Sequence, residues 1–219
     1  MSRQTIDEIR RLSLRLDGQS HRVLRQVEDA VKALSEFVEP VPVEALEDEI
    51  DREEVLLEEE CLRVMALHHP IGGDLRFLTT LIRANVDLER AADHAQSAIR
   101  LSVGLVGQAP DSIVLLSRMS LVLLRDSIQA LLDRDRRQAS AVLSSTVQLQ
   151  TLSDAAIRQS RTLADSADPG SLDRAFLSLR VAMDFRRIGD LACNLAEDAL
   201  YLDQGNIVRH GQGAATAGS

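Results

Sequence analysis

Apolar residues recur at three- and four-residue spacing over long stretches, and this is the feature that most constrains the fold of the chain. The first stripe consists of Ile6, Ile9, Leu12, Leu16, Val23, Val27, Val31 and Leu34. Helix breakers are confined to short clusters around residues 40–42, 70–73, 104–110 and 169–170. The pattern therefore predicts six amphipathic helices, over residues 2–38, 43–69, 71–103, 110–134, 136–165 and 171–203.

Short connections between these segments predict an all-α fold in which sequential helices lie antiparallel. Aromatic residues make up only 2% of the 219 residues and Trp is absent, so Leu and Ala must fill the core. Cys61 and Cys193 lie far apart within helical patterns, and we expect two buried, reduced thiols.

A repeat divides the chain. At an offset of 97 residues, five positions carry the same residue type: Arg83, Asp87, Arg90, Asp93 and Ala95 match Arg180, Asp184, Arg187, Asp190 and Ala192. Such a match between charged residues predicts two tandem three-helix units. We assign residues 1–106 to the first repeat, 107–203 to the second, and 204–219 to a C-terminal tail.

The net charge of −9 argues against a nucleic-acid partner, because phosphate contacts need clustered Lys and Arg. No uncharged apolar run is long enough to span a bilayer, and the charged first residues contain no apolar signal core. The sequence thus predicts a cytoplasmic protein without direct membrane insertion, which partners can bring to the inner face of a membrane.

Two pairs of acidic residues stand one helical turn apart. Glu47 and Asp51 lie on the second predicted helix, and Glu89 and Asp93 lie on the third. The pairs are mirrored about Pro70, so an antiparallel hairpin brings them to similar heights. Four converging carboxylates repel one another unless they are protonated or bind a hard cation such as Mg²⁺, Mn²⁺ or iron.

An acid-rich solvated helix face explains the same residues without a metal, and the motif alone leaves both interpretations open. The second repeat has Ser144, Gln148, Arg186 and Asp190 at the corresponding positions. Only Asp190 remains acidic there, so one metal site is more plausible than two. Arg186 can pair with Asp190 and substitute for a cation.

Several stretches resemble the signatures of the PhoU regulators of phosphate transport. The first signature is similar to residues 70–78 (PIGGDLRFL) and 87–95 (DLERAADHA), and its counterpart is residues 187–198 (RIGDLACNLAED). Residues 49–51 (EID) and 59–62 (EECL) resemble the second helix of the family, and residues 205–210 (GNIVRH) its C-terminal end.

The resemblance implies a pair of three-helix bundles related by a pseudo-two-fold axis. It implies E/DxxxD motifs that bind multinuclear metal clusters, here Glu47, Asp51, Glu89 and Asp93, with iron, manganese, magnesium or zinc as the metal. It also implies a homodimer that negatively regulates phosphate uptake and the phosphate-starvation response. The implied partners are the ATPase of the phosphate ABC transporter and a sensor histidine kinase. Two departures stand out: Ala91-Ala92 replaces the usual Ile-Gly, and Phe185-Arg186 replaces the usual Leu-Glu.

Three alternatives accompany this interpretation. A di-metal carboxylate enzyme is disfavoured, because no Glu is followed by His at the Glu-x-x-His spacing that such sites use. A metal-free helical adaptor and a paralogue that regulates another transporter both stay open. We therefore expect no catalytic residue, and we expect Asn194 to hydrogen-bond between helices.

Overall fold

The computed structural model describes residues 3–36, 43–166 and 168–204, and within these ranges all regular structure is helical. The α-helices are α1 (Arg3–Ala33), α2 (Val43–His68), α3 (Gly73–Ser102), α4 (Asp111–Asp133), α5 (Arg136–Ser144), α6 (Thr146–Ala164) and α7 (Ser171–Gln204), and the 3-10 turn η1 covers Val103–Leu105. This confirms the all-α prediction. Residues 205–219 of the predicted tail lie outside the described residues.

The predicted fifth helix is one continuous segment, and this was wrong: α5 ends at Ser144 and α6 begins at Thr146. Three consecutive hydroxyl residues occupy the break. The Ser145 hydroxyl donates to the Ala141 carbonyl, and the Thr146 hydroxyl donates to the Leu143 carbonyl at 2.5 Å. Such bonds from side chains to nearby carbonyls compete with the helical ladder and interrupt it.

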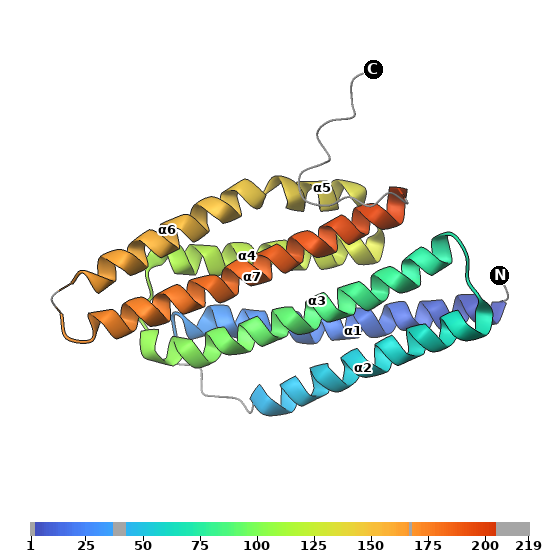
Figure 1. Cartoon of the computed structure of the whole chain (residues 1–219), viewed down its shortest axis with the longest axis horizontal. Helices are drawn as coiled ribbons and strands as arrows, with labels where there is room; N and C mark the ends of the chain where they lie inside the picture. Colours follow the sequence, from blue (N-terminus) through green and yellow to red (C-terminus); the bar gives the residue numbers. More distant parts are fainter. Residues whose placement is uncertain (1–2, 37–42, 167, 205–219) are drawn as a thin grey trace, which may run out of the picture.

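The helices form two groups, which contact each other mainly through α3 and α7 (Figure 1). α1 and α2 pack against α3, while α4, α5 and α6 pack against α7. The two groups are joined by contacts of α3 with α7 and of α1 with α4. The third helix of each predicted repeat therefore lies at the centre of the molecule.

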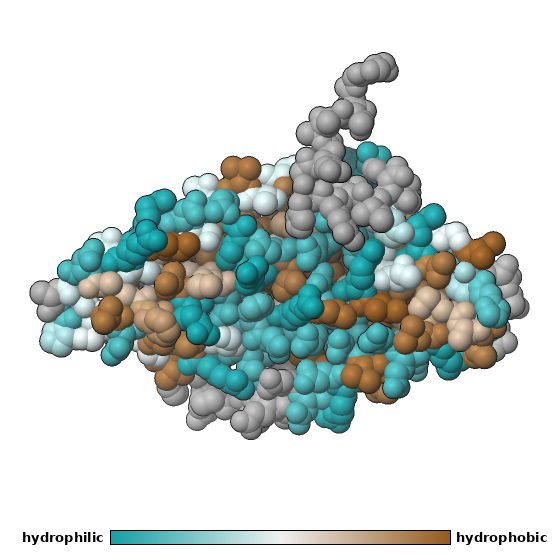
Figure 2. All heavy atoms as spheres, in the orientation of Figure 1, coloured by the Kyte–Doolittle hydropathy of each residue, from teal (hydrophilic) through white to brown (hydrophobic). Residues whose placement is uncertain are grey.

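Leu and Ala dominate the buried core, as the composition predicts, and Phe185 is its largest fully buried side chain. Both cysteines are free and buried, and burial raises the pKa of the Cys61 thiol to about 12. The face drawn in Figure 2 is largely hydrophilic, with apolar groups gathered where α6 and α7 meet at its left end. Leu172 and Phe176, near the start of α7, are 70% and 58% exposed.

Ion pairs hold α2 against α1. The Arg15 guanidinium contacts the carboxylates of Glu53 at 2.7 Å and Glu60 at 2.8 Å, and these hydrogen bonds raise its pKa further above the ordinary range. His68, at the end of α2, contacts Glu8 at 2.9 Å. The residue after α2, His69, has a positive φ of 46°. Gly72, with φ 59°, then turns the chain into α3. Gly suits that conformation because it has no Cβ.

We predict opposite effects for two glycine substitutions within helices. A Cβ at Gly189 on α7 would lie 2.6 Å from the Leu149 Cδ2 on α6, so Gly189→Ala must push a buried side chain and should cost about 1–3 kcal/mol of stability. Gly18→Ala, where the nearest atom is 3.8 Å away, should add about 0.5–1 kcal/mol through helix propensity. Urea unfolding followed by circular dichroism measures both, and a neutral Gly189→Ala would contradict the close approach of α6 and α7.

Candidate functional site

The register of α2 against α3 brings the predicted acidic pairs to the same height. The Asn85 side chain on α3 donates to the Glu54 carbonyl on α2 at 2.8 Å. One turn further along α3, Glu89 lies opposite Asp51, because the two helices run antiparallel. The same register carries Asp93 towards position 47, although the side chain of Glu47 lies outside the described residues.

The described acids lie near enough to influence one another electrostatically. The pKa of Glu89 is raised to about 7, first by burial and then by the charges of Asp93, Glu54 and Asp51. Asp51 and Asp93 are both exposed. Within the described parts of the chain, however, no group of three or more His, Cys, Asp or Glu side chains is close enough to hold a metal ion.

Glu54 belongs to this acidic group, and sequence reasoning missed it. Burial raises its pKa, and the charges of Glu58, Asp51 and Asp93 raise it further, while Arg90 opposes them. The signal was present, since Glu54 stands three residues after Asp51 and so shares its helix face. We use the name acidic group for Asp51, Glu54, Glu89 and Asp93.

The second repeat holds an ion pair at the matching place. The Arg186 Nε donates to the Asp190 Oδ1 at 2.8 Å, and its Nη1 donates to the Gln150 Oε1 on α6 at 2.5 Å. This confirms the expectation that Arg186 pairs with Asp190. Ser144 and Gln148 are exposed and carry no charge. A guanidinium thus bridges α6 and α7 and neutralises Asp190 at this place.

Polar contacts join α3 to α7 along their whole meeting line, which we call the seam. Arg83 contacts Asp198 at 2.6 Å, and Asp87 hydrogen-bonds to Asn194, as expected for Asn194. Further along, Asp184 accepts from the Ser97 hydroxyl at 2.7 Å.

The repeat offset of 97 residues relates two of these contacts. Asp87 in the first repeat corresponds to Asp184 in the second, and Ser97 corresponds to Asn194. The Asp87–Asn194 and Ser97–Asp184 contacts are therefore equivalent under the pseudo-two-fold axis. This register places Arg90 and Arg187 as a second related pair near the centre of the seam.

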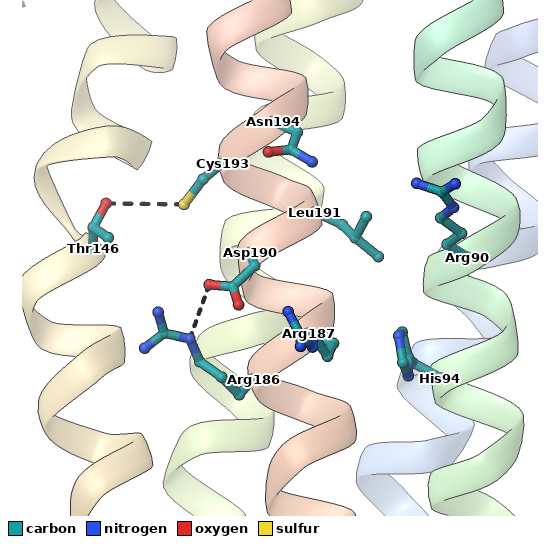
Figure 3. A pocket seen from close by; sticks show the side chains of 9 residues that line it. All are labelled: Arg90, His94, Thr146, Arg186, Arg187, Asp190, Leu191, Cys193 and Asn194. Atoms are coloured by element: carbon teal, nitrogen blue, oxygen red, sulfur yellow. Dashed lines mark hydrogen bonds and ion pairs between the residues drawn. The ribbon is translucent and has the colours of Figure 1, made fainter. Parts of the chain in front are cut away.

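A pocket opens over this central part of the seam (Figure 3). Its lining residues are Arg90, His94, Thr146, Arg186, Arg187, Asp190, Leu191, Cys193 and Asn194. His94 bonds through Nδ1 to the Asp184 carboxylate at 3.0 Å, so its ring faces α7 rather than the acidic group. Sequence analysis did not find this pocket, because its residues come from three segments far apart in the chain.

The model of the PhoU domain matches residues 16–101 and 113–199. This chain belongs to the PhoU family. A phosphate-specific transport system accessory protein PhoU homolog of Pseudomonas aeruginosa is 30% identical over 86% of this chain and 80% of that protein. A protein with the same description from Aquifex aeolicus is 30% identical over 86% of this chain and 90% of its own length. The crystal structure of PhoU from Pseudomonas aeruginosa superposes with a TM-score of 0.85 at 26% identity, covering 91% of this chain and 99% of that one.

PhoU proteins are regulatory accessory proteins, which confirms the expectation that the chain is not an enzyme. The second repeat carries the Arg186–Asp190 pair at the positions that Glu89 and Asp93 occupy in the first repeat. No helix in the described ranges has the length and apolar character needed to cross a membrane.

We predict that ionisation of Asp198 on the PhoU seam lowers stability as pH rises. Burial raises its pKa to about 6, against an opposing effect of Arg83, while the unfolded value is about 3.9. Between these values the folded state binds more protons than the unfolded state, so the free energy of unfolding falls as pH rises and levels off above about pH 6.

Asp198→Asn removes this dependence. The stability of the native chain relative to Asp198→Asn should therefore drop by about 1–2 kcal/mol between pH 4 and pH 7. Urea unfolding of both proteins across this range measures it, and parallel pH profiles would show that Asp198 ionises in the folded protein as easily as in water.

Proposed function

We propose that this PhoU protein is the accessory subunit of a phosphate-specific ABC transport system and a negative regulator of phosphate uptake and of the phosphate-starvation response. It acts by contacting the transporter ATPase and a sensor histidine kinase. The observation that carries the proposal is the match of both repeats to the PhoU domain, together with relatives described as phosphate-specific transport system accessory proteins.

Exposed apolar side chains on α7 form a surface that a protein partner can contact. Leu172, Phe176 and Met183 lie along one side of α7 and are each more than half exposed. Side chains of this kind are stabilised when a protein partner covers them. We assign the protein to the cytoplasm, as a homodimer that its transporter brings to the inner face of the membrane.

Deletion and complementation test the regulatory role. A strain that lacks this chain should express a phosphate-starvation reporter in phosphate-rich medium, and the intact chain should restore repression. The variant Leu172→Ser, Phe176→Ser should lose repression while its helical circular dichroism is retained. The matched variant Leu14→Ser, Leu115→Ser changes exposed apolar residues elsewhere and should still repress. Unchanged reporter expression in the deletion strain would refute the regulatory role.

The acidic group supports a metal-binding role within this function. Its carboxylates supply the oxygen ligands that hard cations prefer, and Glu89 is partly buried among like charges. We propose that Asp51, Glu89 and Asp93, with Glu47, hold a metal ion of the iron, manganese, magnesium or zinc class. A bound cation would supply positive charge that offsets the repulsion between α2 and α3.

Elemental analysis tests the metal site. Protein purified without chelator or affinity nickel should contain stoichiometric metal that is lost in Glu89→Ala, Asp93→Ala. The control Asp111→Ala, Asp203→Ala removes two exposed carboxylates outside the acidic group and should retain the metal. Equal metal content in all three proteins would show that the metal binds elsewhere.

A metal-free adaptor is the second candidate, and one observation favours it. With a pKa of about 7, Glu89 can relieve the repulsion by taking up a proton instead of a cation. The described acids also do not converge closely enough to enclose an ion. Protein that contains no bound metal, yet still represses the reporter, would establish the adaptor.

A further inference from the structure

We propose that the pocket over the seam binds the phosphate group of a small molecule, between Arg90 and Arg187. Four basic side chains line it, Arg90, His94, Arg186 and Arg187, against a single acidic one, Asp190. The chain as a whole has a net charge of −9, whereas basic side chains outnumber acidic ones in this pocket. Guanidinium groups suit phosphate because their donors match its oxygens in pairs.

The carboxylates near the pocket already have partners. Asp190 accepts from Arg186, and the buried Asp184 accepts from Ser97 and His94. Asp190 therefore balances the charge of Arg186. Asp184 fixes the orientation of the His94 ring, and His94 Nδ1 donates this hydrogen bond because a carboxylate can only accept.

Two arginines of the pocket, Arg90 and Arg187, are exposed. Arg187 is exposed and forms no ion pair with any residue that the structure describes. Arg90 is 62% exposed, and its guanidinium approaches Asp87 only to 4.0 Å, at the limit of an ion pair. Figure 3 shows Arg187 in front of α7 at about the height of His94 on α3, with Arg90 further along α3. A phosphate group held between them would meet donors from both repeats.

The size of the pocket favours a phosphorylated small molecule over free phosphate. Its volume of about 610 Å³ lies within the range of pockets for small organic ligands. Leu191 and Cys193 provide an apolar part of the wall, against which the rest of such a molecule can pack. The site uses none of the acidic group, so it is independent of the proposed metal.

Isothermal titration calorimetry on chelator-treated protein tests the proposal. The probes are inorganic phosphate, adenosine monophosphate and adenosine, each at the same ionic strength set with sodium chloride. We expect adenosine monophosphate to bind, phosphate to bind more weakly, and adenosine to show no binding. Arg90→Gln, Arg187→Gln should weaken binding of adenosine monophosphate at least tenfold. The control Arg118→Gln, an exposed arginine outside the pocket, should change it less than twofold.

Thermal unfolding provides a second measurement, since a ligand that binds only the folded state raises the melting temperature. Phosphate salts stabilise most proteins by exclusion from their surfaces, so only the difference between the native chain and Arg90→Gln, Arg187→Gln counts. Equal loss of binding in Arg118→Gln would reveal a general ionic effect and overturn the site. Binding of a polyglutamate peptide, with no binding of either phosphate probe, would overturn it in favour of a docking surface for acidic protein segments.

Discussion

The packing of α3 against α7 is the constraint on which the rest of the structure depends. These two helices are the last helices of the two repeats, and every other described α-helix packs against one of them. Their meeting line is unusually polar for a central interface, with Asp87, Asp184 and Asp198 all held by partners from the opposite helix. Buried polar groups without partners are costly, so this seam tolerates few other registers.

Once the seam is fixed, the two outer surfaces of the repeats become chemically different. Beside α3, the acidic group leaves like charges that repel one another. Beside α7, a guanidinium from Arg186 crosses to α6 and balances the charge internally. The loss of three acids at equivalent positions, one of them replaced by Arg186, thus distinguishes the second repeat from the first, whose acidic group requires a cation or a proton.

The same asymmetry produces the basic pocket. In the first repeat, Arg90 lies near the carboxylates of Glu54 and Asp87, and they offset part of its charge. In the second repeat, Asp190 is already occupied by Arg186, and so its neighbour Arg187 keeps its charge. An acidic protein can carry a local anion site in this way, because the potential in a pocket depends on which charges remain uncompensated there.

The sequence by itself determined the helical fold and most helix boundaries, and it indicated the approach of Asp51 to Glu89; it allowed the pairing of Arg186 with Asp190 without deciding it. Each of these rests on a local period or on a mirrored spacing within one hairpin, and such relations are fixed by the geometry of the helix. Only the tertiary structure decided the partners of Asp184 and Asp198 and the pocket between Arg90 and Arg187. Those features join residues up to about a hundred positions apart, and the packing of α3 on α7, rather than any local pattern, sets which of their side chains meet.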